Sequence, residues 1–139
     1  MKISKLLLFV VVLSMAFSAS AQTIEDGSRK TIGYISSGGT VENASRSTIG
    51  YINPNGMIED GSRRTIGYIR ENGTVENGSH TTIGYISSNG TVENASRSTI
   101  GYVSSNGTVE DGSRRTIGHA SGVKMEHAAL FFFFFFYKK

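Results

Sequence analysis

A 17-residue period dominates this chain. The triplet Thr-Ile-Gly occurs six times at that spacing, and a second short segment of the type Thr-Val-Glu recurs in phase with it. Self-similarity at a fixed period is the signature of a repeat architecture. Both segments are rich in residues that favour strands, so each repeat predicts two short β-strands and the chain is predicted to be all-β. The triplets begin at Thr31, Thr48, Thr65, Thr82, Thr99 and Thr116.

Turn-forming residues separate the predicted strands. Asn-Gly or Gly-Gly pairs, such as Gly38-Gly39 and Asn55-Gly56, occupy one set of connections. These pairs predict tight hairpin turns, because both residues can take positive φ. The other set, such as Asn43-Ala44-Ser45-Arg46-Ser47, is polar and is expected to form longer loops. A Gly or Asn every few residues disfavours helix in this part of the chain.

Alternation within the second strand indicates how it faces. In Thr31–Ile35, Ile32 and Tyr34 share one face, and Thr31, Gly33 and Ile35 share the other. The regular return of a glycine predicts that another backbone or an aromatic ring approaches closely there. One hairpin of this size is marginal in water, so the repeats must bury their apolar faces against one another. Closure into a ring is favoured over an open solenoid, because the terminal repeats are almost as regular as the middle ones.

The repeat also carries a family resemblance. The Gly-x-Val/Ile-Glu and Thr-Ile-Gly-Tyr-Ile elements, together with a phenylalanine-rich end, resemble the five-fold beta-flower proteins exported by Bacteroidetes. The resemblance implies a closed, propeller-like radial array of short β-hairpins around a pseudo-five-fold axis. Five Asn-Gly or Gly-Gly turns agree with a ring of five units. The six Thr-Ile-Gly triplets leave a ring of six units as an alternative. The resemblance implies no activity. His119 departs from the pattern, since the other five repeats have Tyr at that position.

The two ends of the chain differ from the repeats, which span residues 22–122. Residues 1–21 combine Lys2 and Lys5, an apolar run and a small-residue cleavage site, and they predict a signal peptide. We therefore expect an exported protein in the periplasm, at the cell surface or outside the cell. The absence of cysteine excludes disulfides, thiolate metal sites and a lipid anchor on cysteine. Without Lys2 and Lys5 the chain has 12 basic and 11 acidic residues, which disfavours nucleic acid as a partner.

Residues 123–139 form the third segment, which contains six consecutive phenylalanines from Phe131 to Phe136. A segment that is apolar on every side has to be surrounded by protein. The favoured interpretation is a buried plug on the axis of the ring, as a helix from about Glu126 or as a strand. Two alternatives are an exposed patch that drives self-association or membrane contact and, least favoured, a pore-forming strand.

No catalytic constellation, cofactor motif or metal-ligand pattern is visible, so we expect a protein that is not an enzyme and has no cofactor. Repeated glutamates and arginines are expected to form exposed ion pairs rather than a cation-binding ring. His80 replaces an arginine and is interpreted as a surface substitution. The best candidates for ligand binding are regularly spaced aromatics, although the favoured role of these residues is packing inside over the glycines. They are Tyr34, Tyr51, Tyr68, Tyr85 and Tyr102.

Two functions follow as expectations. The first is a non-catalytic structural or interaction protein, with a glycan or an envelope protein as partner and self-association as a further option. The second is a carbohydrate-binding or small-ligand-binding module that uses the tyrosines or the mouth of the ring.

Overall fold

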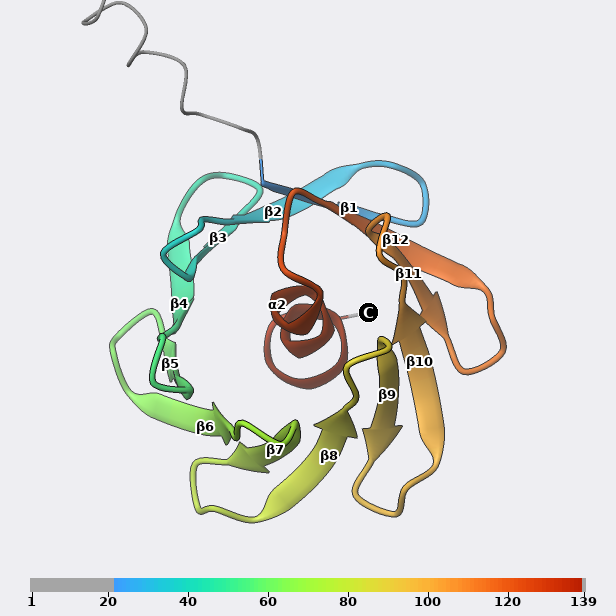
Figure 1. Cartoon of the computed structure of the whole chain (residues 1–139). Coiled ribbons are helices and arrows are strands. Elements are labelled where there is room, and N and C mark those ends of the chain that lie inside the picture. Colours follow the sequence, from blue (N-terminus) through green and yellow to red (C-terminus); the bar gives the residue numbers. More distant parts are fainter. Residues whose placement is uncertain (1–21, 139) are drawn as a thin grey trace, which may run out of the picture.

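The computed structural model describes residues 22–138, which form one closed antiparallel β-barrel of twelve strands around a C-terminal helix (Figure 1). The predicted all-β class and ring closure are confirmed. The predicted signal peptide, residues 1–21, lies outside the described residues, as does Lys139. Each 17-residue repeat supplies two consecutive strands to the barrel, as the sequence predicted.

The strands are short and almost identical from repeat to repeat. The first strands are β1 Thr23–Asp26, β3 Thr40–Asn43, β5 Met57–Asp60, β7 Thr74–Asn77, β9 Thr91–Asn94 and β11 Thr108–Asp111. The second strands are β2 Thr31–Ile35, β4 Thr48–Ile52, β6 Thr65–Ile69, β8 Thr82–Ile86, β10 Thr99–Val103 and β12 Thr116–Ser121. The C-terminal segment holds α2 Met125–Leu130 and the π-helix η1 Phe131–Phe135.

The structure decides the number of units, which the sequence left open between five and six, and corrects one expectation about the ring. The ring has six units, because β1 pairs with β12 from Thr23↔Ser121 to Asp26↔Gly118. This seam takes the place of a sixth glycine-containing turn, so counting such turns gave five. The array is also a barrel and not a propeller, since each strand is paired with the strands before and after it around the whole circle. Full closure leaves no free strand edge.

Both kinds of connection adopt one turn geometry, which also differs from the prediction. In the turn after β2, Gly39 N–H donates to the Ser36 carbonyl at 3.0 Å, and Ser36 N–H donates to the Thr40 carbonyl at 3.0 Å. The turn after β3 repeats this pattern, with Arg46 N–H bonded to the Asn43 carbonyl at 3.0 Å. These are type I turns followed by one left-handed residue. Only that residue has positive φ, 90° at Gly39 and 68° at Arg46, and the asparagine before each such glycine does not.

A β-bulge in each hairpin helps such short strands to close a barrel. In the first hairpin Ile24 lies opposite Gly33, and Glu25 lies opposite Thr31, so that Ile32 is the extra residue. The same shift occurs in the other five hairpins. A bulge increases local twist and bends the strand. Its recurrence distributes the curvature evenly around the ring.

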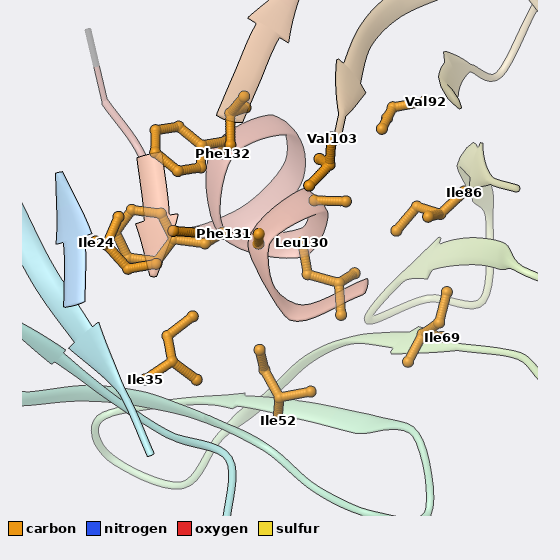
Figure 2. Close-up of a cluster of buried hydrophobic side chains, with 14 of the residues drawn as sticks. Ile24, Ile35, Ile52, Ile69, Ile86, Val92, Val103, Leu130, Phe131 and Phe132 are labelled. Atoms are coloured by element: carbon orange, nitrogen blue, oxygen red, sulfur yellow. The ribbon is translucent and has the colours of Figure 1, made fainter. Parts of the chain in front are cut away.

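The interior of the barrel is lined by two sets of apolar side chains and by the strand glycines. Ile24 from the first strand is fully buried, and Ile35 from the second is 1% exposed. The equivalent core residues in the other repeats are Val41, Ile52, Ile58, Ile69, Val75, Ile86, Val92, Val103, Val109 and Ala120. All of them belong to one core cluster with Leu130 and Phe131, and Figure 2 shows part of it.

The C-terminal segment plugs the bore, as predicted, and it is helical. After β12 the chain reverses at Gly122, where φ is 71°, and then runs along the axis of the barrel as α2 and η1 (Figure 1). Residues from Ala128 to Phe132 are buried, and the remaining phenylalanines are half-buried. Each of the six phenylalanine rings meets one strand glycine, which confirms that an aromatic ring approaches the glycines. The contacts are Phe131 with Gly33, Phe132 with Gly118, Phe133 with Gly101, Phe134 with Gly84, Phe135 with Gly67, and Phe136 with Gly50.

Candidate functional site

The five tyrosines that the sequence singled out lie on the outer wall of the barrel. Gly33 and Ile35 are buried toward the axis, so Tyr34 between them points outward and is half-buried. The four equivalent tyrosines have the same half-buried environment. The favoured prediction, that the tyrosines pack inside over the glycines, was therefore wrong, because the phenylalanines fill that space. The tyrosines are distributed around the circumference and do not gather in one site.

Each outward tyrosine belongs to a small cluster with a glutamate and an arginine. Glu42 lies opposite Tyr34 across the strand pair. The guanidinium of Arg46 lies 3.5 Å from the centre of the Tyr34 ring and donates to Glu42 Oε1 at 3.1 Å. Equivalent stacks join Arg63 to Tyr51, Arg97 to Tyr85 and Arg114 to Tyr102 at 3.5–3.6 Å. The expected ion pairs are confirmed, and we call each such trio an outer cluster.

The outer cluster leaves specific groups available to a ligand. Arg46 covers one face of the Tyr34 ring, so a sugar cannot stack on that face. The arginine side chain is 65% exposed, and its hydrogen bond to Glu42 uses one of its five N–H donors. The cluster thus presents guanidinium donors and a tyrosine edge rather than a bare aromatic plate.

Backbone geometry positions the arginine of the cluster. Arg46 has φ of 68°, a left-handed conformation that non-glycine residues adopt rarely. Asn43 fixes the turn, since its side-chain oxygen accepts from the backbone N–H groups of Ser45 and Ser47, both at 3.0 Å. The left-handed residue directs its side chain back along the outer wall toward Glu42 and Tyr34. Left-handed Arg or His recurs at this position in all six repeats.

One repeat builds the cluster from different residues. His80 stacks on the Tyr68 ring with the ring centroids 4.2 Å apart, and it lies 3.1 Å from Glu76. Arg70, on the opposite turn, supplies the guanidinium at 2.9 Å from the same carboxylate. The hydrogen bond from Arg70 lowers the pKa of Glu76, and the contact with His80 lowers it further by a smaller amount. His80 therefore replaces the stacking role of arginine, and Arg70 restores the ion pair.

The seam repeat has an incomplete cluster. Arg29 pairs with Glu25 at 3.2 Å, but His119 stands opposite Glu25 where other repeats have tyrosine. This position therefore offers an imidazole in place of a phenol on the outer wall.

A second candidate region, which the sequence reasoning did not resolve into residues, surrounds α2 at the mouth of the barrel. Two adjoining clefts of about 280 and 400 Å³ separate α2 from the glycine-containing turns and share Glu71 and Glu126. Lys124, His127 and Arg70 line the first cleft. Burial raises the pKa of Glu126 and lowers the pKa of His127. No sequence motif marks this region, because it exists only once the tail docks in the barrel.

Two further features bear on chemistry. Across residues 22–138, no three His, Asp or Glu side chains come together in a way that could hold a metal ion. In the same stretch, no helix has the length and apolar character that a membrane crossing requires.

Comparison with known protein families identifies the family of the chain. Residues 21–136 match the family model described as 5-fold beta-flower protein, which covers the whole barrel and the phenylalanine run. No curated protein and no solved structure matches the chain.

Proposed function

Because the chain belongs to the 5-fold beta-flower family, whose description names a shape and no activity, we propose that it is a non-catalytic structural or interaction protein that works after export. Its place is the periplasm, the cell surface or the exterior. Its partner is a glycan or a protein of the cell envelope.

The observation that carries this proposal is the repetition of the outer cluster around a filled barrel. Complete Tyr–Arg–Glu clusters occur in four repeats, and the fifth is rebuilt with His80 and Arg70. Several equal sites on one rigid body bind a repetitive partner with high avidity even if each contact is weak. A polymer or an ordered envelope layer presents its own groups repeatedly, so it matches such a surface.

The test removes several outer clusters at once. Native full chain and a Tyr34→Ala, Tyr51→Ala, Tyr102→Ala variant are compared for binding to purified cell-envelope fractions. Avidity predicts a loss of at least about tenfold, since several weak contacts disappear together. Exposed serines on the glycine-containing turns provide the matched control, Ser37→Ala, Ser88→Ala and Ser105→Ala. Equal binding by the tyrosine variant, or no binding by the native chain, contradicts the proposal.

A second candidate function is a carbohydrate-binding or small-ligand-binding module. It is supported by the half-buried tyrosines at the surface and by the mixed-charge clefts beside α2. Guanidinium groups at the clusters favour glycans that carry carboxylate or sulfate groups. Titration calorimetry with an acidic polysaccharide and a neutral one separates this candidate from a protein partner. Saturable heat with soluble glycan supports it, and its absence alongside envelope binding favours a protein partner.

A further inference from the structure

The number of phenylalanines in the tail equals the number of repeats in the ring. Phe131 meets Gly33, and then each step of one residue along the tail moves to the glycine of the adjacent repeat, from Gly118 down to Gly50. The circle closes because Gly33 and Gly50 lie in neighbouring repeats. The rings of Phe131 and Phe136 accordingly lie near each other, with their centroids 6.0 Å apart.

The tail backbone is shaped to make this match. An α-helix has about 3.6 residues per turn, so its consecutive side chains would skip repeats of a six-unit ring. In the tail the Phe131 carbonyl instead accepts from the N–H of Phe136 at 3.3 Å and of Tyr137 at 2.9 Å. Bonds that span five and six residues mark turns wider than those of an α-helix, so consecutive side chains are separated by a smaller angle around the axis and each faces the repeat next to the last. Such wide turns are rare and short in proteins.

The glycines make five of the six contacts specific, and at Gly33 an added methyl group would lie 3.5 Å from the Phe131 ring, an ordinary contact distance. A methyl group built on Gly84 would lie 2.5 Å from a ring carbon of Phe134 and 2.5 Å from the Glu93 carbonyl oxygen. The ring therefore occupies the space that only a missing side chain leaves. A tail with one phenylalanine too few leaves a glycine uncovered, and a tail with one too many has a ring without a place.

From this one-to-one match we infer that the phenylalanine run sets the size of the ring, with one phenylalanine selecting one repeat. The family is described as 5-fold, and this chain closes with six units. Some feature of the chain must therefore determine the number of units in the ring. The tail supplies one that is independent of the nearly identical repeats. Changing the number of phenylalanines is then expected to change which repeat number is stable.

The experiment is a cycle of four full-length proteins. One deletion removes residues 91–107, which form one whole repeat. Gly90 then precedes Thr108, as Gly107 does in the native sequence. The other deletes Phe133, whose ring faces the repeat that is removed. We expect each single deletion to lower the melting temperature by about 5 °C or more, and the double deletion to recover part of that loss. The inference is overturned if the losses of the two single deletions are additive in the double deletion. It is also overturned if the five-repeat proteins do not fold, or if they have the same melting temperature with five and with six phenylalanines.

A second comparison needs no change in the repeats. Phe133→Ala removes one ring but keeps the others in register, whereas deleting Phe133 also shifts Phe134, Phe135 and Phe136 away from their glycines. The deletion is therefore expected to lower the melting temperature more than the substitution. Equal losses would show that the tail only fills space.

Discussion

At the scale of the residue, glycine has different roles at neighbouring positions. Gly39 has φ of 90°, and a side chain there would run into the backbone carbonyl oxygen of Ile52. Gly38 has neither constraint, since the nearest atom to an added methyl group is Ser36 Oγ at 3.9 Å. The other four turns of this kind have asparagine at the position of Gly38, and Asn55 accepts from Met57 N–H at 3.0 Å.

The two adjacent glycines therefore predict opposite effects of one substitution. Gly38→Asn is expected to raise the free energy of unfolding by about 0.5 kcal/mol, because it restricts the unfolded chain and adds the turn bond. Gly39→Asn is expected to lower it by about 2 kcal/mol or more, through the backbone clash. Urea unfolding of both variants measures the difference. Equal effects would contradict the assignment of the left-handed position.

His127 predicts a pH dependence of stability. Burial lowers its pKa below 6.5 in the folded chain, so on acidification the unfolded chain takes up this proton first. Stability is then lost as pH falls from about 6.5 towards the lower folded value. Burial raises the pKa of Glu126, so Glu126 contributes a pH dependence of stability with the opposite sign. The other charged groups that line the same cleft are Lys124, Arg70 and Glu71.

The measurement compares native protein with His127→Gln by urea unfolding between pH 7.5 and 5.5, values chosen to bracket the ordinary histidine pKa of about 6.5. The contributions of the other groups are common to both proteins. The stability of the native protein should fall more steeply with acidification than that of the variant. Parallel curves would mean that His127 is not buried in its neutral form.

At the scale of the element, each hairpin has an aromatic residue on both of its faces. In one repeat, Gly84 receives the Phe134 ring on the inside, and Tyr85 stacks against Arg97 on the outside. Only the inner ring completes the packing of the barrel. The outer ring contributes a cation–π contact at an exposed arginine, worth about 0.5–1 kcal/mol.

This asymmetry predicts unequal alanine effects within one repeat. Phe134→Ala is expected to cost about 3 kcal/mol, at the low end for phenylalanine because the side chain is half-buried. Tyr85→Ala is expected to cost about 1 kcal/mol or less. Chemical denaturation of both variants gives the comparison. A larger loss from Tyr85→Ala would reverse the assignment of inner and outer faces.

At the scale of the whole molecule, stability depends on two closures. The β1–β12 seam removes the free edges of the sheet, and the tail fills the bore that twelve short strands enclose. Two-stranded hairpins of four and five residues are marginal alone. The barrel without its plug would expose the apolar inner face to water, which costs about 25 cal/mol per Å².

Removal of Ala128 to Lys139 is therefore expected to abolish the cooperative unfolding transition. Circular dichroism during heating and urea titration measures this. Deletion of Lys138 and Lys139 alone serves as the control, since Lys138 is exposed, and it should leave the transition in place. An unchanged melting curve for the longer deletion would refute the role of the plug.

The sequence by itself determined the local features of this protein. Turn residues and alternation predicted the paired strands, the two faces of each second strand and the Glu–Arg pairs, because each of these depends on residues within one repeat. The uniform apolarity of the tail predicted burial, since water on any side would be unfavourable.

Only the tertiary structure decided how the repeats close. Six units rather than five follow from the β1–β12 seam, which joins residues at opposite ends of the repeat region. The same holds for the outward tyrosines, whose inner places are taken by phenylalanines far along the chain. Contacts at such distances depend on the geometry of the closed ring, and no local propensity encodes that geometry.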